Sequence, residues 1–312
     1  MPDVILGIDT SCYTTSVAFS SVGRIVNCKR RLLSVEQGER GLRQAEGVYQ
    51  HTRALPELLE QLIEETPEAK IKGICVSARP RNKDDSYMPV FMTGVSFARA
   101  LAAALHVPLE FTSHQQGHIR AAMVDSGLPD GNFVALHLSG GTTQTVLTDT
   151  NVSEIKEIGG TSDLNAGQLV DRTGVYLGLH FPCGPELEKL AKNGNAKSLI
   201  PVSSKNLTCS FSGSETQVQR MIKEGINPSD IAMEVYSFLA RSIARLIASA
   251  AEEAHVRNFL LAGGVASSSL LRELLPQRVK KLNSSLKLYW ARPELSGDNA
   301  CGVALIGDER MR

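Results

Sequence analysis

Two histidines four positions apart are the sharpest chemical feature of the sequence. His114 and His118 stand in the word His-Gln-Gln-Gly-His. On a helix, residues i and i+4 share one face, so both imidazoles can reach one metal ion. Neutral imidazole binds zinc and iron alike, which leaves the metal open. Because the chain has seven histidines, a surface or core pair without a metal is the competing interpretation.

Carboxylates that could complete such a site stand near both ends of the chain. Asp298 precedes a predicted short helix, as an ordinary N-cap or as the third ligand of a two-histidine, one-carboxylate site. The sequence alone favours the cap. Asp9, early in the first predicted hairpin, has the same two interpretations. Gly117, between the histidines, weakens a helix by about 1 kcal/mol relative to alanine. It is easier to explain if something approaches the backbone there.

Glycine-rich turns form a second group of candidates. The word Ser-Gly-Gly-Thr-Thr at 139–143 lies between two predicted strands, where backbone N–H groups and hydroxyls can cradle phosphate oxygens. The word Ala-Gly-Gly-Val at 262–265 follows a strand and opens a helix, an arrangement that suits an anion or a nucleotide. Neither word matches the P-loop or the Rossmann fingerprint, and a Gly-Gly between elements is usually just a tight turn, so each word alone is weak evidence.

The elements that must position these residues alternate between strand-like and helix-like periodicity, which is typical of an α/β protein. Strands are predicted at 4–8, 16–19, 23–31, 71–76, 107–111, 133–138, 143–147, 258–261 and 286–290. Helices are predicted at 47–64, 94–105, around the two histidines, and at 167–177, 185–192, 229–254, 267–275 and 299–306.

An internal repeat indicates how these elements are organised. A displacement of 128 residues places Ser11 on Ser139, Thr14 on Thr142 and Thr15 on Thr143, each between strands. This suggests a duplicated α/β lobe, against the alternative of coincidence among small turn residues. We expect lobe I to cover 1–128, with 296–312 returning to it, and lobe II to cover 129–295.

The overall charge limits the class of partner. The 33 basic and 33 acidic residues balance, which argues against a protein that coats nucleic acid electrostatically. Contact with RNA would need local basic patches, for which we consider 29–31, 79–83 and 278–281. The alternative for each patch is ordinary solvated surface.

Cysteine usage and hydropathy indicate the compartment. The six cysteines are scattered without a C-x-x-C pair, which predicts thiols in a reducing compartment rather than a disulfide framework or a zinc knuckle. The start lacks a charged segment followed by an apolar core, and no apolar stretch is long enough to span a membrane. We therefore expect a cytoplasmic protein without membrane contact.

Over nearly its whole length the chain resembles the threonylcarbamoyl-transferase family that includes TsaD, Kae and their relatives, formerly described as O-sialoglycoprotein endopeptidases of a glycoprotease family. The order and spacing of the matching words make the resemblance specific. They lie at 6–12, 95–101, 114–118, 139–141, 166–171, 177–185, 211–213, 262–265 and 298–299.

The resemblance implies an actin/Hsp70/sugar-kinase (ASKHA, RNase H-like) fold with two duplicated lobes and an interlobe cleft. It implies one divalent metal, iron or zinc, on His114, His118 and Asp298. It also implies that a threonylcarbamoyl-adenylate touches the Ser-Gly-Gly turn, a helix aspartate and a following glycine. The full set of candidate substrate- or nucleotide-binding residues is Ser139, Gly140, Gly141, Thr142, Asp171, Gly184, Gly263, Gly264 and Ser268, and the candidate catalytic carboxylates are Asp9 and Asp171.

The implied reaction transfers the threonylcarbamoyl group from threonylcarbamoyl-AMP to the exocyclic amine of the adenosine next to the anticodon in tRNA. The metal would act as a Lewis acid and template on the carbamoyl group, and AMP would leave. The implied partners are tRNA, the adenylate, an ATP- or AMP-type nucleotide, and protein partners of the tRNA-modification complex or a homologous chain.

Several words depart from the family pattern near the implied site. The usual Asp-Glu of the first hairpin is Tyr13-Thr14, the histidine after Ser-Gly-Gly is Thr142, and the asparagine after Gly-Gly-Val is Ser268. The usual Gly-Pro-Gly loop is a charged segment at 78–85. The chain therefore looks like a divergent paralogue with an intact metal triad.

These departures keep other functions open. One is a non-catalytic paralogue that serves as partner or regulator of a genuine transferase. Another is a transferase or kinase acting on a related small molecule, with Asp9 and Asp171 as its acidic groups. A metalloprotease is disfavoured, because Gln115 stands where the usual zinc-protease word has its glutamate base.

Overall fold

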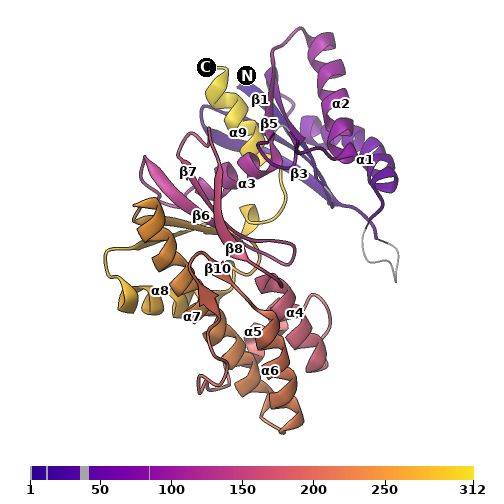
Figure 1. The fold of residues 1–312 in the computed structure, drawn as a ribbon. Coiled ribbons are helices and arrows are strands. Elements are labelled where there is room, and N and C mark those ends of the chain that lie inside the picture. The colour runs from indigo at the N-terminus through magenta and orange to yellow at the C-terminus, as the bar shows by residue number, and fades with distance from the viewer. Residues whose placement is uncertain (1, 12, 36–41, 84) are drawn as a thin grey trace. The chain divides into compact units, whose positions relative to one another are not determined.

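The computed structural model describes residues 2–11, 13–35, 42–83 and 85–312, so Cys12 of the word at 6–12 and Asp84 of the word at 78–85 lie outside it (Figure 1). The described chain divides into two compact units. Unit 1 comprises Met1–Val124 and Gly297–Arg312, and unit 2 comprises Asp125–Ser296. Each unit is described by itself.

Unit 1 is built on a five-stranded sheet with the order β3-β2-β1-β4-β5. Its strands β1, β2 and β3 are antiparallel neighbours, whereas β1, β4 and β5 run parallel. The strands are β1 (Asp3–Thr10), β2 (Thr14–Ser21), β3 (Arg24–Leu32), β4 (Lys70–Arg79) and β5 (Leu109–Ser113).

The two faces of this sheet carry different helices, because alternate side chains of a strand point to opposite sides. Val4, Leu6 and Ile8 pack into a core with buried residues of α1 (Gln44–Glu64) and α2 (Pro89–Leu105). The other face receives α9 (Cys301–Arg310), whose Val303 and Ile306 pack on Ile5. Helix α3 (His114–Met123) packs against α9.

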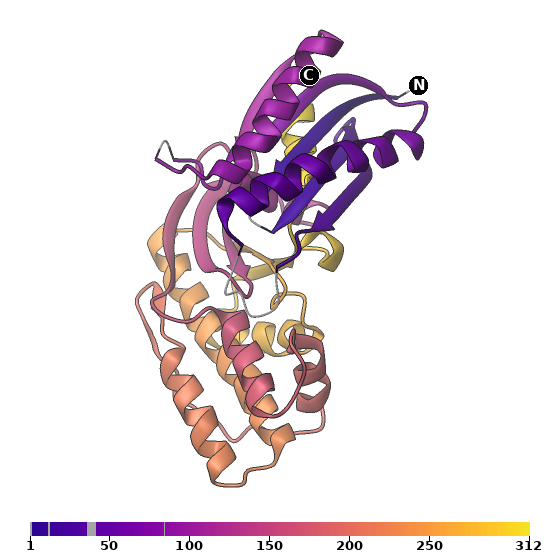
Figure 2. The same cartoon turned by 90° about the vertical axis from the view of Figure 1, so that its right-hand side faces the viewer.

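A glycine in β1 permits the close approach of α9. A Cβ on Gly7 would lie 2.5 Å from the backbone nitrogen of Ala304 and 2.6 Å from the carbonyl oxygen of Ala300. Only glycine leaves room for backbone this near. The C-terminal helix consequently lies against the N-terminal strands, as Figures 1 and 2 both show.

Unit 2 repeats the same plan with additions. Its seven-stranded sheet has the order β12-β11-β6-β7-β8-β10-β9. The run β8-β7-β6-β11-β12 has the same strand directions as β3-β2-β1-β4-β5, with two antiparallel pairs followed by two parallel pairs. The predicted duplication is therefore visible in the topology. The strands are β6 (Asn132–Leu138), β7 (Thr143–Asp149), β8 (Lys156–Thr161), β9 (Ser204–Lys205), β10 (Thr208–Cys209), β11 (Asn258–Ala262) and β12 (Lys287–Trp290).

Helix α7 (Pro228–Ala254) organises the core of unit 2. Its predicted apolar stripe is fully buried, and it packs against α4 (Ala166–Tyr176), α5 (Gly184–Ala191), α6 (Ser212–Lys223) and α8 (Ser269–Leu282). Pro228 at its first position and the Asn227 side chain, which accepts from the N–H of Ser229, start the helix. A short 3₁₀ turn, η1 (Pro293–Leu295), ends the unit.

The predicted strands and helices are all present, but the sequence did not predict β8, β9, β10 or α6. Strand β8 contains two adjacent glycines, and β9 and β10 are two residues each. Helix α6 buries only Ser214, Val218 and Met221, so its apolar stripe is short. Helix α8 extends to Leu282 rather than 275, because it continues through Pro276.

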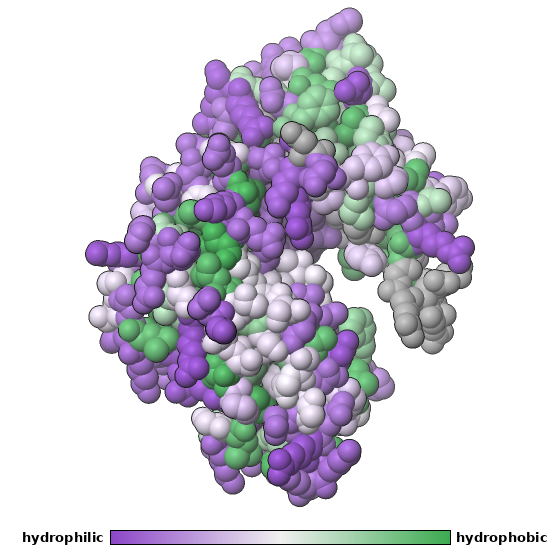
Figure 3. Space-filling view, viewed as in Figure 1, coloured by the Kyte–Doolittle hydropathy of each residue, from purple (hydrophilic) through white to green (hydrophobic). Residues whose placement is uncertain are grey.

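The visible surface is predominantly hydrophilic, with small separated hydrophobic areas (Figure 3). Scattered exposed apolar side chains are normal for a folded chain in water. Among the residues that the structure describes, no helix combines the length and apolar character needed to cross a bilayer.

Candidate functional site

A capping box starts helix α3 at the first histidine. The Ser113 hydroxyl accepts a hydrogen bond from the N–H of Gln116 at 3.2 Å, and the Gln116 side-chain oxygen accepts from the N–H of Ser113 at 3.0 Å. Such reciprocal bonds satisfy amides that would otherwise lack partners at a helix start. They fix the first turn of α3, from which His114 and His118 project.

Close backbone contact between α3 and α9 brings the third candidate ligand to these histidines. A Cβ on Gly302 would overlap the carbonyl oxygen of Gly117, and a Cβ on Gly117 would lie 2.8 Å from a Val303 methyl. The helices touch through these two glycines, which explains the glycine inside the His-x-x-x-His turn. Asp298, just before α9, is thereby held beside α3.

The three side chains converge on one point. The Nε2 atom of His118 lies 3.0 Å from that of His114 and 2.9 Å from Oδ1 of Asp298. The His114 Nε2 atom lies 3.6 Å from the same carboxylate oxygen. All three ligand atoms lie within 4.8 Å of one another. Ligands held roughly 2.0–2.1 Å from a zinc ion stand roughly 3.0–3.4 Å apart, so these separations suit a shared cation.

The interpretation of Asp298 as an N-cap is wrong. The side chain that caps the start of α9 belongs to Asn299, whose Oδ1 accepts from the N–H of Cys301 at 3.0 Å. Asp298 instead accepts from the Ser11 hydroxyl through Oδ2 at 3.0 Å and faces the histidines through Oδ1. Its carboxylate is therefore committed to the cluster.

Asp9 lies behind His114. The carboxylate is fully buried, its oxygens lie 3.0 and 3.1 Å from Nδ1 of His114, and it also accepts from the Ser77 hydroxyl. A carboxylate that accepts a hydrogen bond from the Nδ1–H of an imidazole leaves the Nε2 lone pair for a metal. This position suits the orientation of His114.

The electrostatics favour a positive charge at this point. Burial disfavours the charged imidazole of His114, but the Asp9 and Asp298 carboxylates outweigh it and hold the pKa of His114 well above its ordinary value. Burial also opposes the charge on Asp298, but hydrogen bonds from both histidines keep the pKa of this carboxyl far below its usual range. Two carboxylates around two imidazoles form a donor set that fits a divalent cation.

A further histidine supports the turn that holds Ser11. His51 on α1 is fully buried, with Nε2 2.9 Å from the Ser11 carbonyl oxygen and Nδ1 2.7 Å from the Thr15 hydroxyl. Burial lowers the pKa of His51, so the ring is neutral, donates to the carbonyl and accepts from the hydroxyl. His51 was not among the predicted site residues. The available signal was its place on the apolar stripe that continues with Ala54, Leu55 and Leu58.

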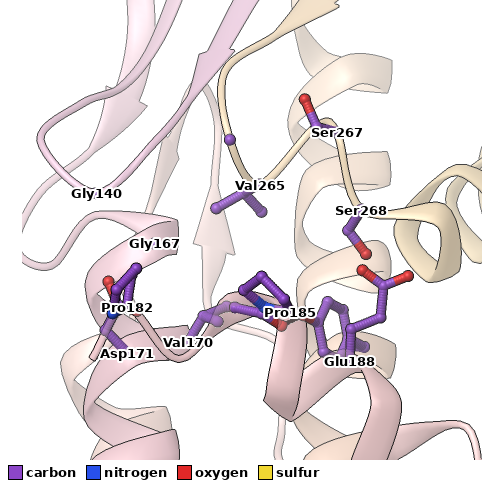
Figure 4. Close-up of a pocket in the computed structure, with 13 residues that line it drawn as sticks. Gly140, Gly167, Val170, Asp171, Pro182, Pro185, Glu188, Val265, Ser267 and Ser268 are labelled. Atoms are coloured by element: carbon purple, nitrogen blue, oxygen red, sulfur yellow. Dashed lines mark hydrogen bonds between the residues drawn. The ribbon is translucent and has the colours of Figure 1, made fainter. Parts of the chain in front are cut away.

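Unit 2 contains a cavity of about 380 Å³ (Figure 4). Five of the predicted site residues line it: Gly140, Asp171, Gly184, Gly264 and Ser268. The other lining residues are Gly167, Val170, Pro182, Pro185, Glu188, Tyr236, Val265 and Ser267. The structure thus brings residues from the two predicted glycine turns and from α4 and α5 to one cavity.

Glycines form part of this cavity wall. A Cβ added to Gly140, Gly184 or Gly264 would meet nothing within 4 Å, so open space lies beside each of these glycines. Gly167 has a different role, since its Cβ would lie 2.5 Å from the backbone nitrogen of Gly140. The start of helix α4 therefore packs directly against the backbone of the Ser-Gly-Gly turn.

The predicted residues outside the cavity lining shape its turns. The N–H of Ser139 donates to the Thr142 carbonyl at 2.8 Å, and the N–H of Thr142 donates to the Ser139 hydroxyl at 3.0 Å. Gly263 has a φ of +101°, and a Cβ there would overlap the Leu138 carbonyl oxygen. Gly141 lies in the same turn as Ser139 but does not line the cavity.

Two carboxylates border the cavity. Asp171 accepts from the N–H of Cys183 at 2.9 Å, and burial raises the pKa of its carboxyl. Glu188 accepts from the N–H of Leu270 at 3.0 Å and from the Ser269 hydroxyl. Burial opposes its charge, but these hydrogen bonds lower the pKa of Glu188. Figure 4 shows the Ser268 hydroxyl directed toward the Glu188 carboxylate.

Glu188 and Tyr236 were not among the predicted site residues. The Tyr236 hydroxyl donates to the Gly184 carbonyl at 3.2 Å, and burial raises its pKa. Glu188 follows Gly184 by one helical turn of α5, so both can face the same cavity. That spacing was the available signal for Glu188.

Sequence comparison identifies the relatives of this chain. A profile of tRNA N6-adenosine threonylcarbamoyltransferases matches residues 42–305. The protein of that name from Fervidobacterium nodosum is 29% identical to this chain, and the match covers 99% of this chain and 94% of the relative. The one from Thermosipho africanus is 30% identical, and the match covers 97% of this chain and 93% of the relative.

Structural comparison gives the fold. Full-length HypF in a phosphate- and nucleotide-bound form matches with a TM-score of 0.60 at 13% identity, over 99% of this chain and 56% of its own. A ROK family glucokinase from Streptomyces griseus, in complex with glucose and AMPPNP, matches with a TM-score of 0.54 at 11% identity, over 98% and 99%. The predicted ASKHA-type fold is confirmed. From the sequence matches, the chain belongs to the TsaD family of tRNA N6-adenosine threonylcarbamoyltransferases.

Proposed function

We propose that this protein is a metal-dependent transferase that moves the threonylcarbamoyl group from threonylcarbamoyl-AMP to the exocyclic amine of the adenosine next to the anticodon in tRNA. The observation that carries the proposal is the convergence of His114, His118 and Asp298, with Asp9 behind the first histidine. Family membership supports the same activity.

His114, His118 and Asp298 would hold iron or zinc, which when bound would supply Lewis-acid polarisation and a template for the carbamoyl group. The residues around them act as positioning residues. Asp9 holds the Nδ1 side of His114, and the Ser11 hydroxyl holds the second oxygen of Asp298. We therefore assign Asp9 an orienting role rather than direct contact with substrate.

The cavity of unit 2 would take the adenylate. Open backbone beside Gly140 and Gly264 suits a phosphate group, because peptide N–H groups bind anions without a side chain in the way. The Asp171 and Glu188 carboxylates suit ribose hydroxyls, which donate hydrogen bonds. Ser268, where the family has asparagine, offers a shorter polar group to the same ligand.

The proposed reaction forms a bond between the adenosine amine and the carbamoyl carbon. The bond from that carbon to the phosphate oxygen breaks, and AMP leaves with the electron pair. The proton that the amine loses passes to solvent. We expect the reaction in the cytoplasm, with tRNA and the protein partners of a tRNA-modification complex.

A second candidate function is that of a non-catalytic partner or regulator of a genuine transferase. It is favoured by the first hairpin, where Tyr13 is 48% exposed and Thr14 is buried at positions that are acidic in the family. Thr142 and Ser268 add two further changed polar groups.

The test is a transfer assay with purified, metal-loaded protein, threonylcarbamoyl-AMP and unmodified tRNA, with nucleosides identified by mass spectrometry. His114→Ala removes one ligand. His255→Asn is the matched control, because His255 is the αL residue after α7 and asparagine tolerates that conformation. Modified adenosine from the parent and the control, but not from His114→Ala, is expected. No product from folded, metal-loaded parent would overturn the proposal and favour the partner role.

A further inference from the structure

Two cysteines meet in unit 1 at a place that the proposed transfer reaction does not use. Cys28 lies on β3, and Cys301 is the first residue of α9. Helix α9 packs against β3, and the two thiols lie near enough to each other to interact. Cys28 is partly exposed and Cys301 is buried.

The register of the sheet produces this contact. Gly7 of β1 pairs with Ala18 of β2, and Ala18 pairs with Cys28 of β3. Directly paired residues point to the same face, so Cys28 continues the row that begins at Gly7. The first turn of α9 lies over that row, because a Cβ on Gly7 would meet the Ala300 carbonyl oxygen at 2.6 Å. The meeting of the two thiols therefore follows from the packing of α9 on the sheet.

The surroundings make Cys28 the more reactive member. The hydrogen bond from the Cys301 thiol lowers the pKa of Cys28 and, despite burial, so do the charges of Arg30 and Lys29 and the backbone of Ala300. The same thiol contact, together with burial, raises the pKa of Cys301.

Other cysteines of the described chain lack this activation. Burial raises the pKa of Cys75 to about 12 and that of Cys209 to about 11. Reactive cysteines combine thiolate character with solvent access. Cys28 is partly exposed, and its surroundings lower the pKa of its thiol.

We propose that Cys28 and Cys301 form a redox-active dithiol that exchanges with small disulfide oxidants such as glutathione disulfide. The Cys28 thiolate attacks one sulfur of the oxidant and releases one glutathione thiolate. The Cys301 thiol loses its proton to solvent and attacks the Cys28 sulfur, which releases the second glutathione. The two cysteines together give up two electrons, and the oxidant becomes two thiols.

The resulting disulfide ties β3 to the first turn of α9, next to the segment that carries Asp298. Because it joins residues near opposite ends of the chain, it closes a very long loop, and such cross-links stabilise mainly by restricting the unfolded chain. The oxidised protein should therefore unfold at a higher temperature than the reduced protein.

The test uses the full chain incubated with glutathione disulfide, followed by non-reducing peptide mapping, thiol counting and thermal unfolding. We expect loss of two thiols, a cross-linked peptide joining Cys28 to Cys301, a melting temperature several degrees higher, and full reversal by dithiothreitol. Cys28→Ser should abolish the cross-link, and Cys301→Ser should trap Cys28 with bound glutathione. Cys75→Ala, from the same row of the sheet, should behave like the parent.

Three results on the parent chain itself would overturn the proposal, whether or not the variants fold. They are unchanged thiols, glutathione on Cys28 without a link to Cys301, and a link from either residue to Cys12. The readout is covalent and needs neither tRNA nor the adenylate. A failed transfer reaction would thus leave this result standing, and a failed cross-link would leave the transfer assay interpretable.

Discussion

The two hairpin turns of the repeat share one backbone device. In unit 1 the Ser11 hydroxyl oxygen lies 3.3 Å from the Thr14 carbonyl oxygen and shares its one proton between that oxygen and Asp298, and in unit 2 the Ser139 hydroxyl donates to the Thr142 carbonyl at 3.3 Å. These are the residues that a displacement of 128 aligns. The repeat thus extends from strand order to an individual hydrogen bond.

The surroundings of the two turns differ completely. Ser11 is 2% exposed and is held by the side chains of Asp298 and His51. Gly140 and Gly141, in the second turn, have open space where a side chain would stand. One turn supports a site made of side chains, and the other places open glycine backbone beside a cavity. The duplicated fold therefore supplies only the backbone scaffold. The residues packed around each turn determine which chemistry the turn can support.

The variant with the largest expected effect disturbs the contact between α3 and α9 in unit 1. Gly302→Ala places a methyl group against the Gly117 carbonyl, so α3 and α9 must separate. We expect a loss of about 3 kcal/mol in the free energy of unfolding and loss of bound metal. Denaturant unfolding and metal analysis measure both. Gly213→Ala, at a helical glycine with open space around it, should retain metal and stability. Equal behaviour of the two variants would contradict the proposed role of this contact.

The second prediction concerns the His51 side chain, a support that only the turn at Ser11 has. His51→Leu leaves the Ser11 carbonyl and the Thr15 hydroxyl without their partner, which should cost about 2 kcal/mol. Because burial lowers the pKa of His51, its contribution is complete above the unfolded value of 6.5 and is lost as the pH falls through the folded value.

The stability difference between parent and His51→Leu should therefore shrink between pH 7.5 and pH 5. Chemical denaturation at the two pH values measures it. A difference that stays constant, or grows, in acid would rule out a neutral buried His51.

The third prediction tests the open backbone of the second turn. Gly140→Val should lower AMP affinity at least tenfold, about 1.4 kcal/mol, because the side chain would occupy cavity space while touching no protein atom. The melting temperature should change little. Gly141→Val is the matched control, since Gly141 has the same open surroundings but does not line the cavity. Isothermal titration of both variants with AMP measures the two affinities. Equal affinities would show that Gly140 is not part of the AMP site.

The smallest effects are expected from alanine variants of the two turn serines, Ser11 and Ser139. Ser11→Ala and Ser139→Ala each remove one turn hydrogen bond, and each should cost about 1 kcal/mol of stability. Only Ser11→Ala should also weaken metal binding, by several-fold, because only Ser11 donates to Asp298. Metal titration of the two variants separates them. Weaker metal binding by Ser139→Ala would contradict the claim that only the turn at Ser11 supports the metal ligands.

Local sequence patterns predict the elements and part of the site. The hairpin strands and the buried stripe of α7 follow from apolar periodicity, and the His-x-x-x-His spacing predicts two ligands on one helix face. The partners of Asp298 do not follow from local pattern, because they depend on contact between α3 and α9, far apart in the chain. Locally, an aspartate before a helix predicts a cap, and Asn299 takes that role instead. His51 and Glu188 were missed for the same reason, since their neighbours come from distant segments.

The contact between Gly117 and Gly302 also has a consequence for biosynthesis. The carboxylate of Asp298 is synthesised 180 residues after His118, the second of the two imidazoles that it joins. A nascent chain that has not reached Asp298 holds only part of the donor set. During translation the set of three side chains therefore forms only after Asp298 has been made and the segment that carries it has docked against α3.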